Sequence, residues 1–297
     1  MNVIPAPLRT ETGSGAFRFR SGTRVDDADA TLAPIVERFC RDVSRRAGLQ
    51  LDATIRAGDP APDDAPSVRI EVTDNGDLAA LPATIGVSQV ADVMPDERYA
   101  LTTGGNGVSI RAREPAGVAR GLTTLLQLLA STPREPDGAV TVPAQRIFDV
   151  PQFAWRSFSL DVARRFFTVR EVQRLIDLLA LYKFNVLNMH FTDDQGWRLP
   201  FGRPANGQDP ADPSDPFYSL ADVRELARYA AERFVTLVPE VDAPGHASAI
   251  TSVRPEPLSG RNAVDFEPVP GMQYHSVWFD PDLPATYDVL TGLPKVF

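Results

Sequence analysis

Cysteine is nearly absent from this chain, and long apolar runs are absent as well. Cys40 is the only cysteine among 297 residues, so an intrachain disulfide is impossible and nothing argues for an oxidising compartment. Its position beside Phe39 in a helical pattern predicts a buried apolar thiol. No stretch approaches the roughly 18 consecutive apolar residues of a membrane-spanning helix.

Basic charge is also in short supply. The 30 Lys and Arg side chains are outnumbered by 39 Asp and Glu, which gives a net charge of −9. Because no basic stripe accompanies this acidity, we expect neither nucleic acid nor a membrane as a partner. Residues 1–7 lack the basic start, apolar core and cleavage site of a signal peptide, so we expect a cytoplasmic protein. Secretion stays open if a leader has been removed.

Residues 1–150 are predicted to form a small α+β domain. Helical periodicity over 30–47 and over 115–129 indicates two helices, and Pro115 suits the first turn of the second. Strand patterns occur at 16–20, 67–73, 98–103 and 108–113. The last two flank a Gly/Asn-rich turn at 104–107, which is typical of a β-hairpin. We therefore expect a sheet with helices on one face.

Residues 151–297 alternate strands with helices. Strands are predicted at 156–160, 184–189 and 235–241, and helices start at the capping box Thr168–Glu171 and at Ser219. A loop rich in Pro, Asp and Gly is predicted over 200–218. This order predicts a parallel sheet with right-handed crossovers. About three βα units are present, which indicates an incomplete α/β barrel whose active site would lie past the carboxyl ends of its strands.

The first two strand ends carry side chains suited to binding a sugar. Arg164 could donate a planar fork of hydrogen bonds to hydroxyls or to a carboxylate, and a local ion pair with Asp161 is an equal alternative. Asp193 and Asp194 repel each other, so at least one should be solvated, hydrogen-bonded or raised in pKa. One of them could hold a catalytic partner in position, or the pair could form an Asx turn.

Two further residues near these strand ends have both a functional and a structural interpretation. His246 follows the turn Pro244-Gly245, which would aim it back over the strand mouth, and its pKa is easily tuned near neutral pH. It could equally be a structural histidine. Trp197 could stack on a sugar or belong to the core.

Four segments of the chain carry a resemblance to a known family. They are Arg156 to Arg164, Leu181 to Leu187, His190 to Trp197 and Pro239 to His246. In pattern and spacing they resemble glycoside hydrolase family 20, the β-N-acetylhexosaminidases. Val3 to Pro7 and the helix from Pro115 resemble the N-terminal α+β domain of that family more weakly. The resemblance implies an α+β domain over 1–150 and the N-terminal part of a catalytic TIM-type (β/α)8 barrel over 151–297.

The resemblance also implies an activity and its residues. Family members remove terminal N-acetylglucosamine or N-acetylgalactosamine with retention, and the 2-acetamido oxygen of the substrate is the nucleophile. Arg164 is implied to grip sugar hydroxyls, and Asp193 and His246 to support the catalytic acid. The implied partners are oligosaccharides or glycoconjugates that end in these sugars, chitin fragments among them. No cofactor and no metal are implied.

The sequence departs from the family pattern at the catalytic acid. In the family an adjacent Asp-Glu pair follows Gly-Gly, and no Gly-Gly-Asp-Glu occurs in these 297 residues. Arg165 stands where the family usually has histidine. Because general acid catalysis and acetamido orientation each contribute orders of magnitude in rate, we expect this chain to be the N-terminal part of such an enzyme, without hexosaminidase activity of its own.

Two other functions fit the same residues. A metallohydrolase could use His190, Asp193, Glu240 and His246 as zinc ligands. A non-catalytic sugar-binding module would keep Arg164 and Trp197 and bind N-acetylglucosamine without turnover.

Overall fold

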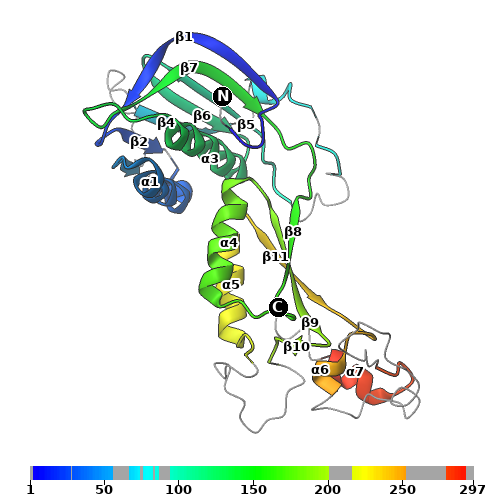
Figure 1. Ribbon diagram of the computed structural model, residues 1–297. Helices are drawn as coiled ribbons and strands as arrows, with labels where there is room; N and C mark the ends of the chain where they lie inside the picture. The colour runs from blue at the N-terminus through cyan, green and yellow to red at the C-terminus, as the bar shows by residue number, and fades with distance from the viewer. Residues whose placement is uncertain are drawn as a thin grey trace, which may run out of the picture. The chain divides into compact units, whose positions relative to one another are not determined.

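A computed structural model describes residues 3–27, 29–55, 67–73, 76–82, 84–86, 94–200, 216–251 and 279–291. The chain divides into two compact units (Figure 1). The first unit is Met1–Arg156 with Ala180–Lys183, and the second is Ser157–Leu179 with Phe184–Phe297. No helix within the described part of the chain is long and apolar enough to cross a membrane.

The first unit is built on a seven-stranded sheet in the order β1-β7-β5-β6-β4-β2-β3. Its strands are β1 (Arg9–Phe19), β2 (Arg24–Asp27), β3 (Asp52–Ile55), β4 (Ser67–Val72), β5 (Tyr99–Gly104), β6 (Gly107–Ala112) and β7 (Val140–Asp149). The pairing of Gly104 with Gly107 confirms the predicted hairpin between β5 and β6. The sequence did not reveal β2, β3 or β7, and it placed the start of β1 at residue 16. Most of the first seven residues of β1 are exposed and show no alternation, so they carry no strand pattern.

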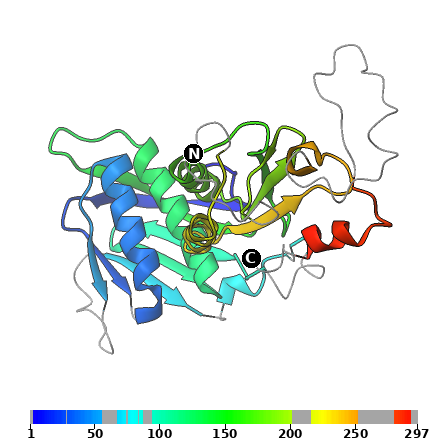
Figure 2. The same ribbon diagram turned by 90° about the horizontal axis from the view of Figure 1, so that it is seen from below.

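Two long helices lie side by side on one face of this sheet, as predicted (Figure 2). They are α1 (Ala33–Ala47), which a 3-10 turn at Ala30–Leu32 precedes, and α3 (Pro115–Ser131). The predicted apolar face of α1 is buried. Cys40 is only half-buried, so the prediction of a buried thiol is wrong in degree. Burial and the negative charge of Asp52 raise the pKa of this thiol to about 11.

Charged side chains inside the first unit explain why residues 180–183 belong to it. Lys183 is buried, and its Nζ donates to the hydroxyl of Tyr99 at 2.8 Å and to Asp149 Oδ2 at 2.9 Å. A second buried group joins Glu97 to two arginines, Arg120 and Arg156, each at 2.5 Å. Buried charges in proteins persist when they are paired in this way, and the two contacts of Lys183 anchor residues 180–183 to the sheet.

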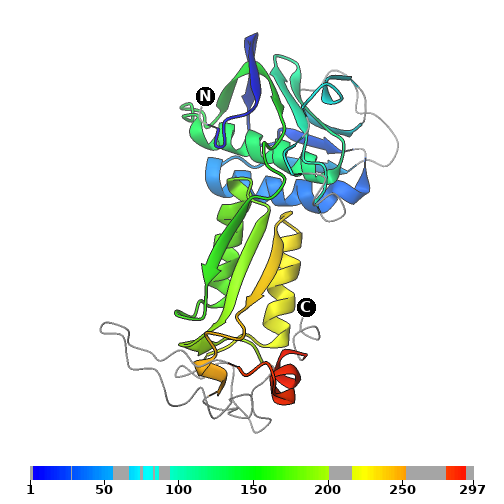
Figure 3. The same ribbon diagram turned by 90° about the vertical axis from the view of Figure 1, so that its right-hand side faces the viewer.

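The second unit confirms the predicted alternation of parallel strands and helices. β9 (Val186–Asp193) lies between β8 (Ser157–Asp161) and β11 (Thr236–Val241) and is parallel to both. The helices α4 (Val169–Leu181) and α5 (Leu220–Ala231) lie on one face of these strands (Figure 3). Short elements complete the unit: β10 (Gly196–Trp197), α6 (Ser248–Thr251) and α7 (Pro284–Leu290).

Capping boxes fix where α4 and α5 begin. The Glu171 carboxylate accepts from Thr168 N–H at 2.7 Å, and Thr168 Oγ1 accepts from Glu171 N–H at 3.3 Å, as predicted. Ser219 and Asp222 form the equivalent box at α5. The predicted loop over 200–218 lies largely outside the described residues.

Candidate active site

The strand β9 carries its polar residues inside the strand rather than beyond it. We predicted that this strand ends at Met189, but it continues to Asp193. The extension forms because β10 turns back and pairs with it, with Gly196 opposite Asp193. β11 also continues alongside β9 across a bulge after Glu240. His190 and Asp193 are therefore held by a paired backbone.

Asp193 is the centre of the site. It is 1% exposed, and both of its carboxylate oxygens are engaged. Oδ2 lies 2.6 Å from Arg164 Nη2 and 2.9 Å from His190 Nε2. Oδ1 lies 3.2 Å from His246 Nδ1 and accepts from the backbone N–H of Asp194 at 2.7 Å. These partners hold the buried carboxylate in one orientation.

Arg164 combines the two roles that the sequence left open. Its Nη1 donates to Asp161 at 2.7 Å, which is the local ion pair, and its Nη2 reaches across to Asp193. Its Nε donates to Gln195 at 3.1 Å. The side chain is still 47% exposed, so it faces solvent at the strand mouth. Although burial raises the pKa of Asp161, hydrogen bonds from the side chain and backbone of Arg164 outweigh this and lower it.

His246 reaches the site through an uncommon backbone conformation. Its φ is +54°, a region that non-glycine residues rarely adopt. In this conformation Nδ1 lies 3.2 Å from Asp193 and 3.5 Å from Asp194. Asp194 itself accepts from Ser248 N–H at 3.2 Å and from its Oγ at 2.7 Å. The two adjacent acids therefore share His246, but Asp193 also faces Arg164 whereas Asp194 binds Ser248.

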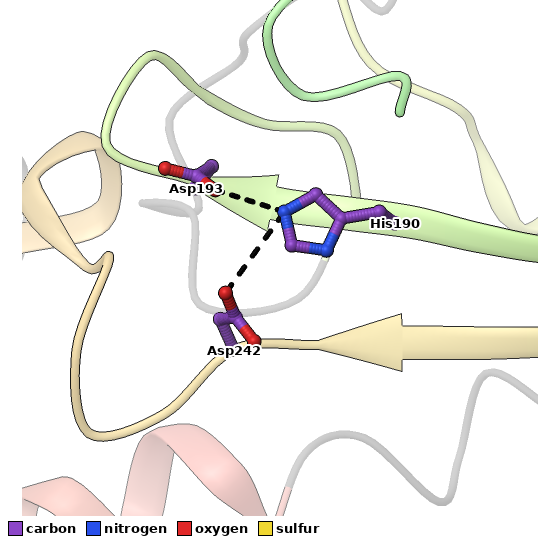
Figure 4. Close-up of side chains that lie close together, drawn as sticks. All are labelled: His190, Asp193 and Asp242. Carbon is purple, nitrogen blue, oxygen red and sulfur yellow. Dashed lines mark hydrogen bonds and ion pairs between the residues drawn. The ribbon is translucent and has the colours of Figure 1, made fainter. Parts of the chain in front are cut away.

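His190 contacts more of the acidic residues of this site than the sequence indicated. It is 6% exposed, and its ring contacts acids of two strands, with Nδ1 2.7 Å from Glu240 Oε1 of β11 and Nε2 2.9 Å from Asp193 of β9. Asp242 Oδ2 lies 4.0 Å from the same Nε2 (Figure 4). The amide of Asn188 donates to the other oxygen of Glu240. Only the pairing register of β9 with β11, which a single sequence does not show, brings these groups together.

Trp197 belongs to the core and not to a sugar platform. It is 2% exposed and packs with Ala247, Ile250, Phe279 and Val289. The interpretation of Trp197 as a stacking surface is therefore wrong. Of the two residues that supported the hypothesis of a non-catalytic sugar-binding module, only Arg164 remains.

Arg198 supports the turn that carries Arg164, a role that the sequence did not reveal. It is buried and donates to the carbonyls of Val162 at 3.1 Å and of Ala163 at 2.9 Å. It also donates to the Pro216 carbonyl at 2.9 Å. Sequence alone does not separate a buried arginine from an exposed one. These bonds fix the backbone immediately before Arg164.

The donor atoms of this site do not suit a divalent cation. Two overlapping groups come close enough to share an ion, namely His190 with Asp193 and Asp242, and Asp193 with Asp194 and His246. Both depend on Asp193, whose Oδ2 already faces the permanent positive charge of Arg164 at 2.6 Å. A second cation there would be repelled by the guanidinium.

We therefore expect the purified chain to contain no stoichiometric metal. Plasma mass spectrometry after gel filtration in metal-free buffer measures this directly. One zinc per chain, reduced by Asp193→Asn but not by Asp161→Asn, would instead support the metallohydrolase.

Comparison with known proteins shows which family this chain is similar to. The family model "Glycosyl hydrolase family 20, catalytic domain" matches residues 153–295, and "Glycosyl hydrolase family 20, domain 2" matches residues 1–150. A Beta-N-acetylhexosaminidase of Cellulomonas fimi is 40% identical and is aligned over 98% of this chain and 56% of its own length. A Beta-hexosaminidase of Vibrio furnissii is 34% identical over 97% of this chain and 49% of its own. The chain thus spans about half the length of these curated relatives.

Solved structures agree with these matches. The N-acetyl-beta-hexosaminidase of Streptomyces plicatus in complex with Thio-NAglucal superposes with a TM-score of 0.74 at 28% identity, covering 99% of this chain and 57% of that one. A beta-N-acetylhexosaminidase of Streptomyces coelicolor gives a TM-score of 0.71 at 29% identity with the same coverage. The predicted order of an α+β domain followed by part of a catalytic barrel is confirmed.

Proposed function

Because this chain belongs to glycosyl hydrolase family 20, we propose that its second unit carries the sugar-gripping and acid-supporting side of a β-N-acetylhexosaminidase active site. The observation that carries the proposal is the buried Asp193 carboxylate, which is held between Arg164 and His246. In this role Asp193 is not the acid that protonates the leaving group. Both of its oxygens already face protein groups, so neither is left to meet the leaving-group oxygen.

Arg164 is the residue that binds the sugar. Among the described residues its Nη1, Nη2 and Nε each engage one acceptor, whereas each Nη carries two N–H groups. One N–H on each Nη is therefore left for neighbouring hydroxyls of a terminal sugar. The acids behind the guanidinium fix its plane, so little side-chain freedom is lost on binding. A Streptomyces plicatus relative at 28% identity has been solved with N-acetylglucosamine as product, which supports this sugar class.

His246 links Asp193 to the catalytic acid. A carboxylate at 3.2 Å from Nδ1 favours the tautomer with its proton on that nitrogen, which leaves Nε2 to face the catalytic acid. We propose that an imidazole held in this way orients an adjacent carboxylic acid. The reaction supported in this way is removal of terminal N-acetylglucosamine or N-acetylgalactosamine, in which the acetamido oxygen of the substrate attacks the anomeric carbon. The 297 residues contain no Gly-Gly-Asp-Glu, so we propose that they bind the sugar without turning it over.

Binding of methyl N-acetyl-β-D-glucosaminide tests the proposal. We expect saturable shifts of the Arg164 Nε–H signal in NMR spectra at millimolar ligand, because the aromatic walls common to binding pockets are not among the site residues described. Arg164→Lys keeps the charge but removes the planar fork, so binding should fall at least about tenfold.

Arg165→Lys is the matched control for this experiment, since Arg165 is the exposed neighbour and lies over Phe167. It should bind like the wild type. Equal binding by all three chains, or no binding by the wild type, contradicts the proposal.

A further inference from the structure

His190 has a carboxylate against each ring nitrogen, which makes it unusual among the residues of this site. Nδ1 lies 2.7 Å from Glu240 Oε1, and Nε2 lies 2.9 Å from Asp193 Oδ2. A neutral imidazole has one N–H donor and one bare nitrogen. In either neutral tautomer, one bare nitrogen would therefore face a carboxylate oxygen at hydrogen-bond distance. Only the doubly protonated ring donates to both.

The neighbours of His190 favour that charged ring. Arg164 has only N–H donors, so the Asp193 Oδ2 that it contacts at 2.6 Å serves as an acceptor, and the proton between this oxygen and Nε2 belongs to the ring. Asp242 lies 4.0 Å from Nε2, and Asp161, on the neighbouring strand β8, also interacts electrostatically with the ring. Burial lowers the pKa of His190. This effect is outweighed by the hydrogen bonds to Asp193 and Glu240 and by the negative charges of Glu240 and Asp242, so the pKa lies above its ordinary value.

From this geometry we infer that His190 is a positioning residue: as a buried imidazolium it bridges β9 and β11 and turns the Asp193 carboxylate so that Oδ1 faces His246. The inference deepens the proposed function, on which it rests for the role of His246. Two cations, His190 and Arg164, converge on Oδ2. Oδ1 is then the oxygen left for His246 and for the backbone N–H of Asp194. Glu240 is the anchor of His190 on the second strand.

The protonation state of His190 is directly measurable, because the chain has only three histidines. Two-bond ¹⁵N–¹H correlation spectra of the wild-type chain resolve each ring nitrogen, and His190→Gln assigns the signals. At pH 7.5 an ordinary histidine, with a pKa of about 6.5, is mostly neutral. We expect both nitrogens of His190 to be protonated at this pH. A bare nitrogen on His190 at pH 7.5 overturns the inference. The protonation state is measured on the wild-type chain, and the His190→Gln variant serves only to assign the signals.

Two carboxylate variants test the bridge. Glu240→Gln removes the carboxylate at 2.7 Å and should lower the titration midpoint of His190. Asp242→Asn removes an anion that is equally charged but 4.0 Å away, so its effect should be smaller. An equal or reversed order contradicts the assignment of Glu240 as the anchor.

The tautomer of His246 reports the positioning role. In His190→Gln the Asp193 carboxylate loses one of the two cations that orient it, so we expect the Nδ1–H form of His246 to mix with the Nε2–H form. A purely structural histidine would leave this tautomer unchanged, and an unchanged tautomer overturns the role. All of these spectra are recorded without sugar. Failure of sugar binding would therefore count against the proposed function and leave the state of His190 as a separate result.

Discussion

Replacing Asp193 with asparagine is expected to lower the free energy of unfolding of the second unit by about 3 kcal/mol. Arg164, His190 and the backbone N–H of Asp194 each point a donor at the carboxylate, and His246 Nδ1 lies 3.2 Å from Oδ1. In either orientation of the asparagine amide, its NH2 group faces one of these donors. His190 is also left as a buried cation without the carboxylate that it contacts. The loss of stability therefore comes from disrupting a buried hydrogen-bond network and not from losing a surface ion pair.

Asp161→Asn is the matched control, because Asp161 pairs with the same arginine at 2.7 Å but is 38% exposed. An exposed pair contributes at most about 1 kcal/mol, so this variant should lose much less. Urea denaturation followed by tryptophan fluorescence compares the two, since Trp197 is buried in the same unit. Equal losses at the two positions would show that Asp193 is not the centre of the network.

The loss at Asp193 should also depend on pH. The pKa of His190 is raised in the folded chain, so its stabilising contribution is fully present below its ordinary pKa of about 6.5 and disappears as pH rises through the folded value. The difference between the wild type and Asp193→Asn should therefore be larger at pH 6 than at pH 9. A difference that grows with pH would have the wrong sign.

Gly196→Ala is expected to destabilise the second unit by about 1–3 kcal/mol. A Cβ at this position would lie 2.5 Å from the Ala163 carbonyl oxygen and 2.6 Å from Arg198 Cζ. The first contact is backbone and cannot move without shifting the turn that carries Arg164. Sugar binding should therefore weaken together with stability.

Gly245→Ala is the control for this prediction. It lies in the same unit, beside His246, and an added Cβ there meets nothing within 4 Å. Thermal unfolding and the sugar titration should both leave this variant close to the wild type. If the two alanine variants lose the same stability, the close contacts at Gly196 do not explain why glycine is required at that position.

The sequence predicted the parts of the fold that repeat a pattern. Helices α1, α3, α4 and α5 follow from apolar periodicity and caps, because both are local signals. The strands β2, β3 and β7 were missed, since short or mixed strands acquire their character from neighbours that are distant in the chain. The extension of β9 to Asp193 was missed for the same reason, because it depends on pairing with β10.

Within the site, the sequence identified residue types better than their surroundings. Arg164, Asp193 and His246 meet as the strand ends suggested. His190 and Arg198 were not assigned positions in the network, and Trp197 was offered a surface role although it is buried. Burial and pairing of a polar side chain depend on which strands become neighbours. A single sequence does not contain that register.

Hydrolysis of p-nitrophenyl N-acetyl-β-D-glucosaminide tests the central claim most directly, namely that Asp193 supports a catalytic acid and does not act as one. The assay compares the purified 297-residue chain with its His246→Ala and Asp193→Asn variants at equal concentration. We expect no release of p-nitrophenol by the wild type above either variant. Release by the wild type that falls in both variants would contradict it, because the residues present would then suffice for catalysis.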